Sequence, residues 1–388
     1  MRDSGHNTRR AFGLVVVAAL AVFATACLPP KPAPRAAPAP KGGGGAPAPA
    51  PAPAPTLTPA PGGNSASAIA VMVSDTVSKV IDFPDPSVTK VGDTYYAYST
   101  GSGFNTLQEI KSTDLVTWTW VGDPFSGPGP YAATTTGSGW ANLFANTWAP
   151  TMLELPSNPP ETRYVLYYTS LSTVSGSSGK HCIGRAVSAS PEGPFVDDQT
   201  KPMICDVARG GSVDPSPIVV NGHVYLSWQS FGVAATGEPT RLWTTRLTDD
   251  GLATNGTQVQ NLETLGWSFE PPVIEGPSMM PSPDGGYLLF YSTGVWSTAD
   301  YKMAVAYCPS PTSACTRFYS TPVLATRGTM AGPGGPAVFK DLSGNWMLAF
   351  HAWTSPYIGY KSSDARYART FRMLPITFPS GGHKPKIG

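Results

Sequence analysis

The sequence predicts an all-β protein built as a five-bladed β-propeller. A short phrase containing proline returns five times, and the prolines of successive copies are 56 to 65 residues apart. A period near 60 with several strands per unit is typical of radial repeats. Thr, Ser, Gly, Pro and aromatic residues dominate, and stretches rich in Lys or Glu that would favour helices are absent. The five phrases begin at Asp85, Ala149, Asp214, Glu275 and Gly332.

Each phrase leads into a segment of aromatic and aliphatic residues, as expected for a buried strand. Because every blade adds its own packed layer, a folded region of about 310 residues suits one propeller rather than one large core. We therefore predict that residues 75–388 form the propeller domain. The expected strands cover residues 94–98, 164–168, 224–228, 287–291 and 346–350.

The first 27 residues resemble an export signal. Paired arginines, Arg9 and Arg10, precede an apolar run at 11–23 that is too short to span a bilayer permanently. Small residues then precede Cys27, which resembles a bacterial lipoprotein cleavage site with acylation of that cysteine. Ordinary secretion is the alternative, and the arginines fit twin-arginine export as well as the general secretory route.

Residues 28–74 are rich in Pro, Ala and Gly and poor in apolar side chains, which predicts a disordered linker. In an extended polyproline conformation of about 3.1 Å per residue, such a linker reaches on the order of 100 Å. A lipid on Cys27 and this tether together predict a protein anchored to the outer face of the cytoplasmic membrane, which it touches through the lipid alone. A secreted protein is the alternative.

The charge balance excludes one class of partner. The net charge is +1 and only 13% of the residues are charged, so no basic patch indicates nucleic acid binding. We expect a monomer whose partner is a polysaccharide or an oligosaccharide.

Four cysteines follow Cys27, and an even number in an exported chain indicates disulfides. Proximity in the sequence favours Cys182 with Cys205 and Cys308 with Cys315. Three pairings of four cysteines are possible.

Three of the five phrases carry a carboxylate, namely Asp85, Asp214 and Glu275. Equivalent positions of all blades face the propeller axis, so these acids are expected to converge on one cavity. Like charges and burial then separate their pKa values, which a general acid and a general base require. Each acid taken alone could instead be an ordinary turn residue.

The order of several motifs resembles glycoside hydrolase family 43, which contains five-bladed arabinofuranosidases, arabinanases and β-xylosidases. The resemblance covers essentially the whole predicted propeller. The motifs lie at residues 83–88, 112–118 (Ser-x-Asp-Leu-x-x-Trp), 148–150 (Trp-Ala-Pro), 190–195 (Ser-Pro-x-Gly-Pro-Phe), 214–216, 274–277 and 350–353.

This resemblance implies an inverting hydrolase with three acidic roles. Asp85 is the implied general base that activates water, and Glu275 is the implied general acid that protonates the leaving oxygen. Asp214 is the implied partner that orients the acid and tunes its pKa. Inverting geometry implies that the base and acid carboxyls are about 6.5–9.5 Å apart.

Three further residues are candidates for binding substrate or metal, and each also has an interpretation without a functional role. Trp148 is a candidate platform for a sugar ring or a packing residue of its blade. Arg327 is expected to hold Asp214 or a sugar hydroxyl, unless it is solvated. His351 is a candidate ligand for a calcium ion on the axis, as the resemblance implies, or else a core histidine.

Two positions depart from the family pattern. Arabinanase-like members often have a histidine where this chain has Gly335, and Thr151 replaces an acid that often follows Trp-Ala-Pro. The first departure weakens both the metal site and an endo-arabinanase reading.

The favoured function is therefore an exo-acting α-L-arabinofuranosidase at the cell surface. A galactofuranosidase or a β-xylosidase on the same fold is the nearest alternative. A non-catalytic glycan-binding propeller is another, although such a protein has no need for all three acids. Fructan hydrolases also begin with Asp-Pro, but their Arg-Asp-Pro motif is absent because Val213 precedes Asp214.

Overall fold

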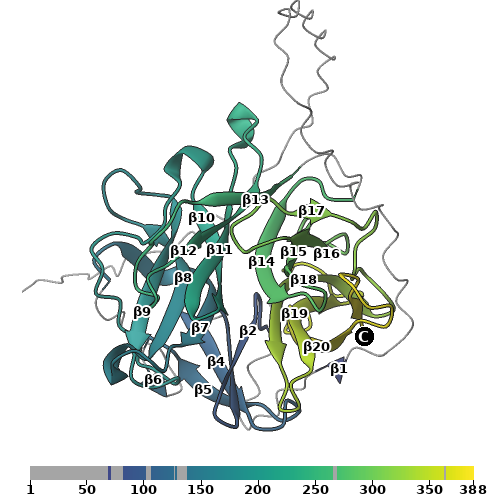
Figure 1. The fold of residues 1–388 in the computed structure, drawn as a ribbon, viewed down its shortest axis with the longest axis horizontal. Helices are drawn as coiled ribbons and strands as arrows, with labels where there is room; N and C mark the ends of the chain where they lie inside the picture. The colour runs from purple at the N-terminus through teal and green to yellow at the C-terminus, as the bar shows by residue number, and fades with distance from the viewer. Residues whose placement is uncertain are drawn as a thin grey trace, which may run out of the picture. The chain divides into compact units, whose positions relative to one another are not determined.

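The computed structural model describes residues 69–70, 82–101, 106–125, 127–128, 138–264, 269–361 and 364–388. The predicted signal peptide, Cys27 and nearly all of the predicted linker lie outside the described residues. Five antiparallel sheets follow one another along the chain, so the all-β five-bladed propeller is confirmed (Figure 1). Within the described part of the chain, no helix is long and apolar enough to cross a membrane.

In each blade one inner strand lies at the axis and its sheet partners lie progressively outward; in the fifth blade the first and the last described strands both pair with the outer strand. All five strands expected from the sequence are the second strands of their blades. Blade I contains β2 (Ser87–Val91), β3 (Thr94–Thr100), β4 (Leu107–Ser112), β5 (Thr119–Asp123) and β6 (Gly127–Pro128). Blade II contains β7 (Ala141–Glu154), β8 (Tyr164–Ser172) and β9 (His181–Ser188).

The remaining blades repeat this plan. Blade III contains β10 (Ser212–Val220), β11 (His223–Ser230), β12 (Arg241–Arg246) and β13 (Val259–Glu263). Blade IV contains β14 (Ile274–Pro281), β15 (Tyr287–Thr293), β16 (Lys302–Cys308) and β17 (Thr316–Arg317). Blade V contains β18 (Met330–Lys340), β19 (Trp346–Thr354), β20 (Thr370–Thr377), β1 (Ile69–Ala70) and β21 (Lys386–Ile387). Short 3₁₀ turns cover η1 (Pro160–Thr162), η2 (Val207–Arg209) and η3 (Ala234–Thr236).

The core lies between neighbouring blades rather than at one centre. Between blades V and I, for example, the Trp118 ring meets the Phe371 ring edge-on at 5.3 Å. Trp118 is held in place by the turn before it, where the Asp114 carboxylate accepts the backbone N–H groups of Val116 and Thr117. The Ser-x-Asp-Leu-x-x-Trp motif is thus a turn followed by a packing residue.

Both ends of the described chain pair with the same strand. β1 pairs with β20 so that Ile69 lies opposite Met373, and β21 pairs with β20 so that Ile387 lies opposite Ile376. β1 falls within residues 28–74, the range predicted as linker, so at least these two residues of that range join the propeller.

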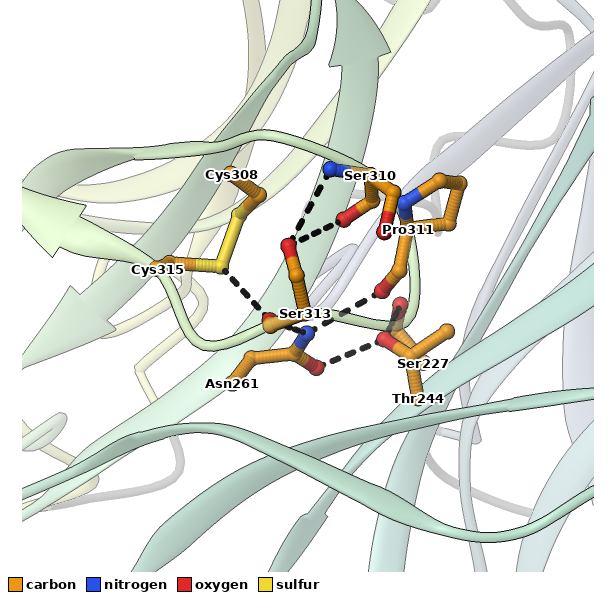
Figure 2. Close-up of a disulfide and its surroundings, with 8 residues drawn as sticks. All are labelled: Ser227, Thr244, Asn261, Cys308, Ser310, Pro311, Ser313 and Cys315. Carbon is orange, nitrogen blue, oxygen red and sulfur yellow. Dashed lines mark hydrogen bonds between the residues drawn. A yellow bond between two sulfur atoms is a disulfide. The ribbon is translucent and has the colours of Figure 1, made fainter. Parts of the chain in front are cut away.

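The two expected disulfides are confirmed: Cys182 is bonded to Cys205, and Cys308 is bonded to Cys315. Figure 2 shows how the second of these loops is tied to blade III. The side-chain amide of Asn261 on β13 donates to the carbonyl oxygens of Pro311 (3.1 Å) and Ser313 (2.8 Å). The disulfide loop therefore contributes to the contact between blades III and IV.

Candidate active site

Each blade has a residue with positive φ directly before a proline, which lies in the inner strand or, in blade I, immediately before it. Such backbone is uncommon outside glycine and costs on the order of 1–3 kcal/mol. In blades II to V the kink coincides with a shift in strand register, which turns the chain at the mouth of the axis. The φ angles are 50° at Asp85, 44° at Ala149, 59° at Asp214, 58° at Gly276 and 64° at Gly335.

This pattern corrects the predicted register in two blades. The fifth copy begins at Gly335 and not at Gly332, because Gly335 is the residue that lines the central cavity. The chain contains Gly-Pro twice in this stretch, which explains the difference. In blade IV the kinked residue is Gly276, so Glu275 lies one residue earlier than Asp85 and Asp214 lie in their blades. Its side chain is one methylene longer than theirs.

Hydrogen bonds between neighbouring blades hold four of these kinks. In each case the backbone N–H of the kinked residue donates to a side chain on the second strand of the preceding blade. We call these four contacts the latches. They join Ala149 to Thr100 Oγ1 (2.9 Å), Asp214 to Thr169 Oγ1 (3.1 Å), Gly335 to Ser292 Oγ (2.8 Å) and Asp85 to His351 Nδ1 (2.9 Å).

Blade IV departs from this arrangement beside Glu275. The Gly276 N–H donates to the carboxylate Oδ2 of Asp214 at 3.0 Å. Gln229 stands at the position that supplies the acceptor side chain of the latch in the other blades. It lines the cavity, and its buried Oε1 has no hydrogen-bond partner among the described residues. Asp214 has thus replaced the second-strand side chain that holds the kink in the other blades.

The kinked residues surround a cavity of about 610 Å³ on the propeller axis. Inner strands of all five blades line it, and Asp85, Asp214, Glu275 and Trp148 are among the lining residues. The three acids therefore do converge on one cavity, as expected. Their chemical roles stay predictions.

Asp85 is held in its ionised form by its neighbours. Burial raises the pKa of Asp85, but the Arg369 guanidinium at 3.3 Å, the nearby His351 ring and the Thr100 hydroxyl at 2.7 Å together outweigh this effect and lower it. Thr100 also accepts the Ala149 N–H, so its hydroxyl proton is directed toward Asp85. A carboxylate in this setting is ionised at neutral pH and can accept a proton.

The other two acids have the opposite electrostatics. Burial raises the pKa of Glu275 to about 7, and the Tyr301 hydroxyl, which donates to Oε1 at 2.6 Å, partly opposes this shift. Burial and the nearby Glu275 and Asp85 raise the pKa of Asp214 well above its usual range. The site therefore pairs an ionised carboxylate with carboxyls that retain a proton, which is the arrangement of a general base and a general acid.

Arg369, which no sequence motif indicates, supplies the cation that pairs with Asp85. Its backbone N–H donates to Asp82 Oδ1 (2.7 Å) and its Nε donates to the Tyr360 hydroxyl (3.1 Å). The guanidinium also lies 4.8 Å from the centre of the Trp296 ring. Tertiary contacts thus fix a residue that is 284 positions away from Asp85 in the chain.

The structure separates the two predicted substrate-binding residues. Arg327 is not among the residues that line the cavity, and its Nη2 is buried without a hydrogen-bond partner in the described structure. Trp148 does line the cavity, and one face of its ring stacks on His181 with centroids 3.8 Å apart. Two aromatic residues that the sequence reading missed, Phe231 and Trp296, also line it and are 40% exposed.

His351 does not fit the predicted calcium site. Its Nδ1 accepts the Asp85 N–H, and burial lowers its pKa to about 3, so the hydrogen-bond network assigns the single ring proton to Nε2. A protonated nitrogen cannot bind a metal, and moving the proton to Nδ1 would break the latch to Asp85. His351 Nε2 itself is buried and has no hydrogen-bond partner among the described residues, and those residues contain no group of three or more His, Cys, Asp or Glu that could hold a metal ion.

Gly335 is part of the same arrangement. A Cβ atom at this position would come within 2.8 Å of His351 Nδ1 and 3.2 Å of the Asp85 Cα atom. A larger residue here would displace His351 from Asp85. The glycine at 335, which departs from the family pattern, therefore leaves space for His351, whose latch to Asp85 joins blade V to blade I.

Known proteins resemble this chain in sequence and in fold. The family model described as Glycosyl hydrolases family 43 matches residues 79–383. The chain is 27% identical over 243 residues to a probable arabinan endo-1,5-alpha-L-arabinosidase A from Aspergillus niger, covering 57% of this chain and 71% of that protein. A protein of the same description from Aspergillus flavus is 26% identical over 323 residues, or 76% of this chain and 88% of that one.

The fold has close counterparts among solved structures. The crystal structure of a thermostable family-43 glycoside hydrolase superimposes with a TM-score of 0.64 at 20% identity. The superposition covers 81% of this chain and 96% of that one.

Proposed function

The chain belongs to glycosyl hydrolases family 43, and on that premise we propose that it cleaves α-L-arabinofuranosyl linkages in an arabinose-containing polysaccharide. It is a glycoside hydrolase of an inverting family. The observation that carries the proposal is the separation of pKa values at the cavity. Asp85 is kept ionised beside Arg369, while burial raises the pKa of Glu275 to about 7.

In the proposed reaction, Asp85 and Glu275 act on opposite sides of the anomeric carbon. Asp85 takes a proton from a water molecule as the water oxygen forms its bond to that carbon. Glu275 gives its proton to the glycosidic oxygen as the bond from the carbon to this oxygen breaks. The electron pair of the broken bond stays on the leaving oxygen, and the configuration of the sugar inverts.

Asp214 is proposed to orient the acid. Its carboxyl holds the N–H of Gly276, the residue directly after Glu275, so a shift of Asp214 would move the acid with it. We propose that the free face of Trp148 packs on the apolar face of a sugar ring.

The choice of sugar rests on two kinds of support. The motifs resemble a family of arabinofuranosidases, arabinanases and β-xylosidases, and the names of the relatives refer to arabinan. Those names favour cutting within arabinan chains, whereas the sequence alone favours removal of single terminal residues. Both actions use the same linkage chemistry, and the experiment below separates them.

The test is to incubate the full-length protein with linear α-1,5-arabinan and with aryl α-L-arabinofuranosides, β-galactofuranosides and β-xylosides. Glu275→Gln and Asp85→Asn proteins serve as controls. Oligosaccharide products from arabinan indicate endo action, and arabinose alone indicates exo action. The first sugar released should have inverted anomeric configuration by proton NMR. Hydrolysis of only the galactofuranoside or xyloside would refute the choice of sugar, and binding without turnover would favour a glycan-binding propeller.

The place of action is the second part of the proposal. Two disulfides are typical of proteins that leave the cytoplasm. We propose that acylated Cys27, which lies outside the described residues, anchors the enzyme to the membrane surface. Cys27→Ser should move activity from the membrane fraction to the medium, and unchanged fractionation would refute the anchor.

A further inference from the structure

We propose that Tyr301 is a positioning residue that links Glu275 to the Asp85 side of the cavity through His351. This inference rests on the proposed function, because it assigns Tyr301 to the acid of that reaction. Tyr301 directly precedes β16 in blade IV, His351 lies on β19 in blade V, and Asp85 precedes β2 in blade I.

The link consists of three successive contacts. The Tyr301 hydroxyl donates to Glu275 Oε1 at 2.6 Å. The Tyr301 ring lies nearly parallel to the His351 ring, with 5.9 Å between centroids and 11° between planes. His351 Nδ1 in turn accepts the Asp85 N–H at 2.9 Å. One continuous set of contacts thus connects the proposed acid to the backbone of the proposed base across three blades.

Tight packing holds Tyr301 in this position. The residue is only 3% exposed. A Cβ atom on Gly334 would overlap the Tyr301 ring, so the absence of a side chain at 334 is what admits the ring. A side chain fixed by packing on one side and by a short hydrogen bond on the other keeps Glu275 in one orientation.

Tyr301 also acts on the ionisation of Glu275. The charged groups that influence Glu275 are Asp85 and Arg369, and Asp214 is influenced by Glu275 in turn. Burial is the largest effect and raises the pKa of Glu275, whereas the Tyr301 hydrogen bond lowers it. Loss of the hydroxyl should therefore raise this pKa further.

The chain provides a matched control in the same blade. The Tyr291 hydroxyl donates to Glu270 Oε1, also at 2.6 Å, and Tyr291 is fully buried. Neither Tyr291 nor Glu270 lines the cavity. Tyr291→Phe and Tyr301→Phe thus remove the same kind of hydrogen bond at a structural carboxylate and at the proposed acid.

The experiment measures kcat/KM against pH for the full-length wild type, Tyr301→Phe and Tyr291→Phe, with an arabino-oligosaccharide whose leaving group needs protonation. We expect Tyr301→Phe to move the basic limb upward by roughly 0.5–1 pH unit, which corresponds to one ordinary hydrogen bond. We also expect it to lower kcat about tenfold. Tyr291→Phe should lower the melting temperature without moving either limb. An unmoved limb in Tyr301→Phe, or an equal shift in both variants, would overturn the proposal.

A second readout does not require activity. Carbon-13 NMR of labelled glutamate carboxyls, with Glu275→Gln to assign the signal, reports the pKa of Glu275 directly. A rise of this pKa in Tyr301→Phe supports the link even if the wild type cleaves none of the substrates. If the wild type is active but the pKa of Glu275 is the same in the wild type and in Tyr301→Phe, the link is refuted and the proposed function stays intact.

Discussion

Glu270, just before the first strand of blade IV, and Glu275, on that strand, lie five residues apart and differ mainly in one partner. Each accepts a tyrosine hydroxyl on Oε1 at 2.6 Å. Glu270 also receives two hydrogen bonds from Arg317, at 2.6 Å from Nε and 2.8 Å from Nη2, and is fully buried. Glu275 has no ion pair among the described residues and lines the cavity, and its pKa is raised to about 7.

The difference lies in which carboxylates have an arginine as ion-pair partner. Arg317 makes Glu270 a structural brace, and Arg369 makes Asp85 an ionised carboxylate. Glu275 and Asp214 share the cavity with Asp85 but have no ion pair within the described residues. A buried carboxyl that has no cationic partner therefore has a raised pKa and can carry a proton at neutral pH.

The largest effects are expected from matched substitutions of the two glutamates. Glu275→Gln should lower kcat by about 10²–10⁴-fold or more, since it removes general acid catalysis, and should leave the fold intact. Glu270→Gln should instead keep kcat but lower the free energy of unfolding by about 3–5 kcal/mol, because Arg317 is left buried without its partner. Kinetics and urea unfolding of both variants check this, and equal losses of activity would remove the distinction.

Replacing each of the two arginines by methionine tests directly whether Arg369 keeps Asp85 ionised. Arg369→Met should raise the pKa of Asp85, so the acidic limb of kcat/KM should move to higher pH. Arg317→Met should leave both limbs in place and lower the melting temperature. The measurement is a pair of pH–rate profiles, and an unmoved acidic limb in Arg369→Met would mean that another group keeps Asp85 ionised.

The raised pKa of Glu275 also predicts how the free energy of unfolding changes with pH. A carboxyl whose pKa is higher in the folded state than in the unfolded state favours folding only while it is protonated. Its contribution is lost as pH rises from about 4.5 to about 7, by up to about 3 kcal/mol. Urea unfolding at several pH values should show this loss in the wild type and a smaller one in Glu275→Gln, and identical curves would place the effect elsewhere.

The smallest expected effect concerns metals. Because His351 Nδ1 accepts the Asp85 N–H and the single ring proton is therefore assigned to Nε2, we expect a calcium chelator to leave the melting temperature and kcat unchanged. Activity and thermal unfolding with and without chelator check this. A loss that added calcium restores would place a second cation in the cavity, and the account based on Arg369 alone would then be wrong.

The repeated part of the fold could be predicted from the sequence because each blade carries its own local signal. Proline phrases mark the inner strands, and aromatic runs such as 287–291 mark the second strands. The same signal placed the fifth phrase three residues early, because Gly332-Pro333 and Gly335-Pro336 look alike in sequence.

The site could be predicted only where it follows the repeat. Asp85, Asp214 and Glu275 lie at blade openings, so their convergence follows from blade equivalence. Arg369 and Tyr301 lie outside the phrases and reach the cavity through contacts between blades, which no local pattern records. His351 lies in a recognised motif, but its proton position depends on the Asp85 backbone, which only the fold brings near.

The pairing along β20 has a consequence for the order of the chain. Gly388 donates its N–H to the carbonyl of Pro375, and Ile69 lies opposite Met373, so only Leu374 separates the two segments along this edge. β21 and β1 run in the same direction there and form an interrupted single strand. A circularly permuted gene that joins Gly388 to Ile69 through one residue would keep the strand register. New termini could then be opened in a surface turn between two other blades, and the propeller would have no preferred first blade.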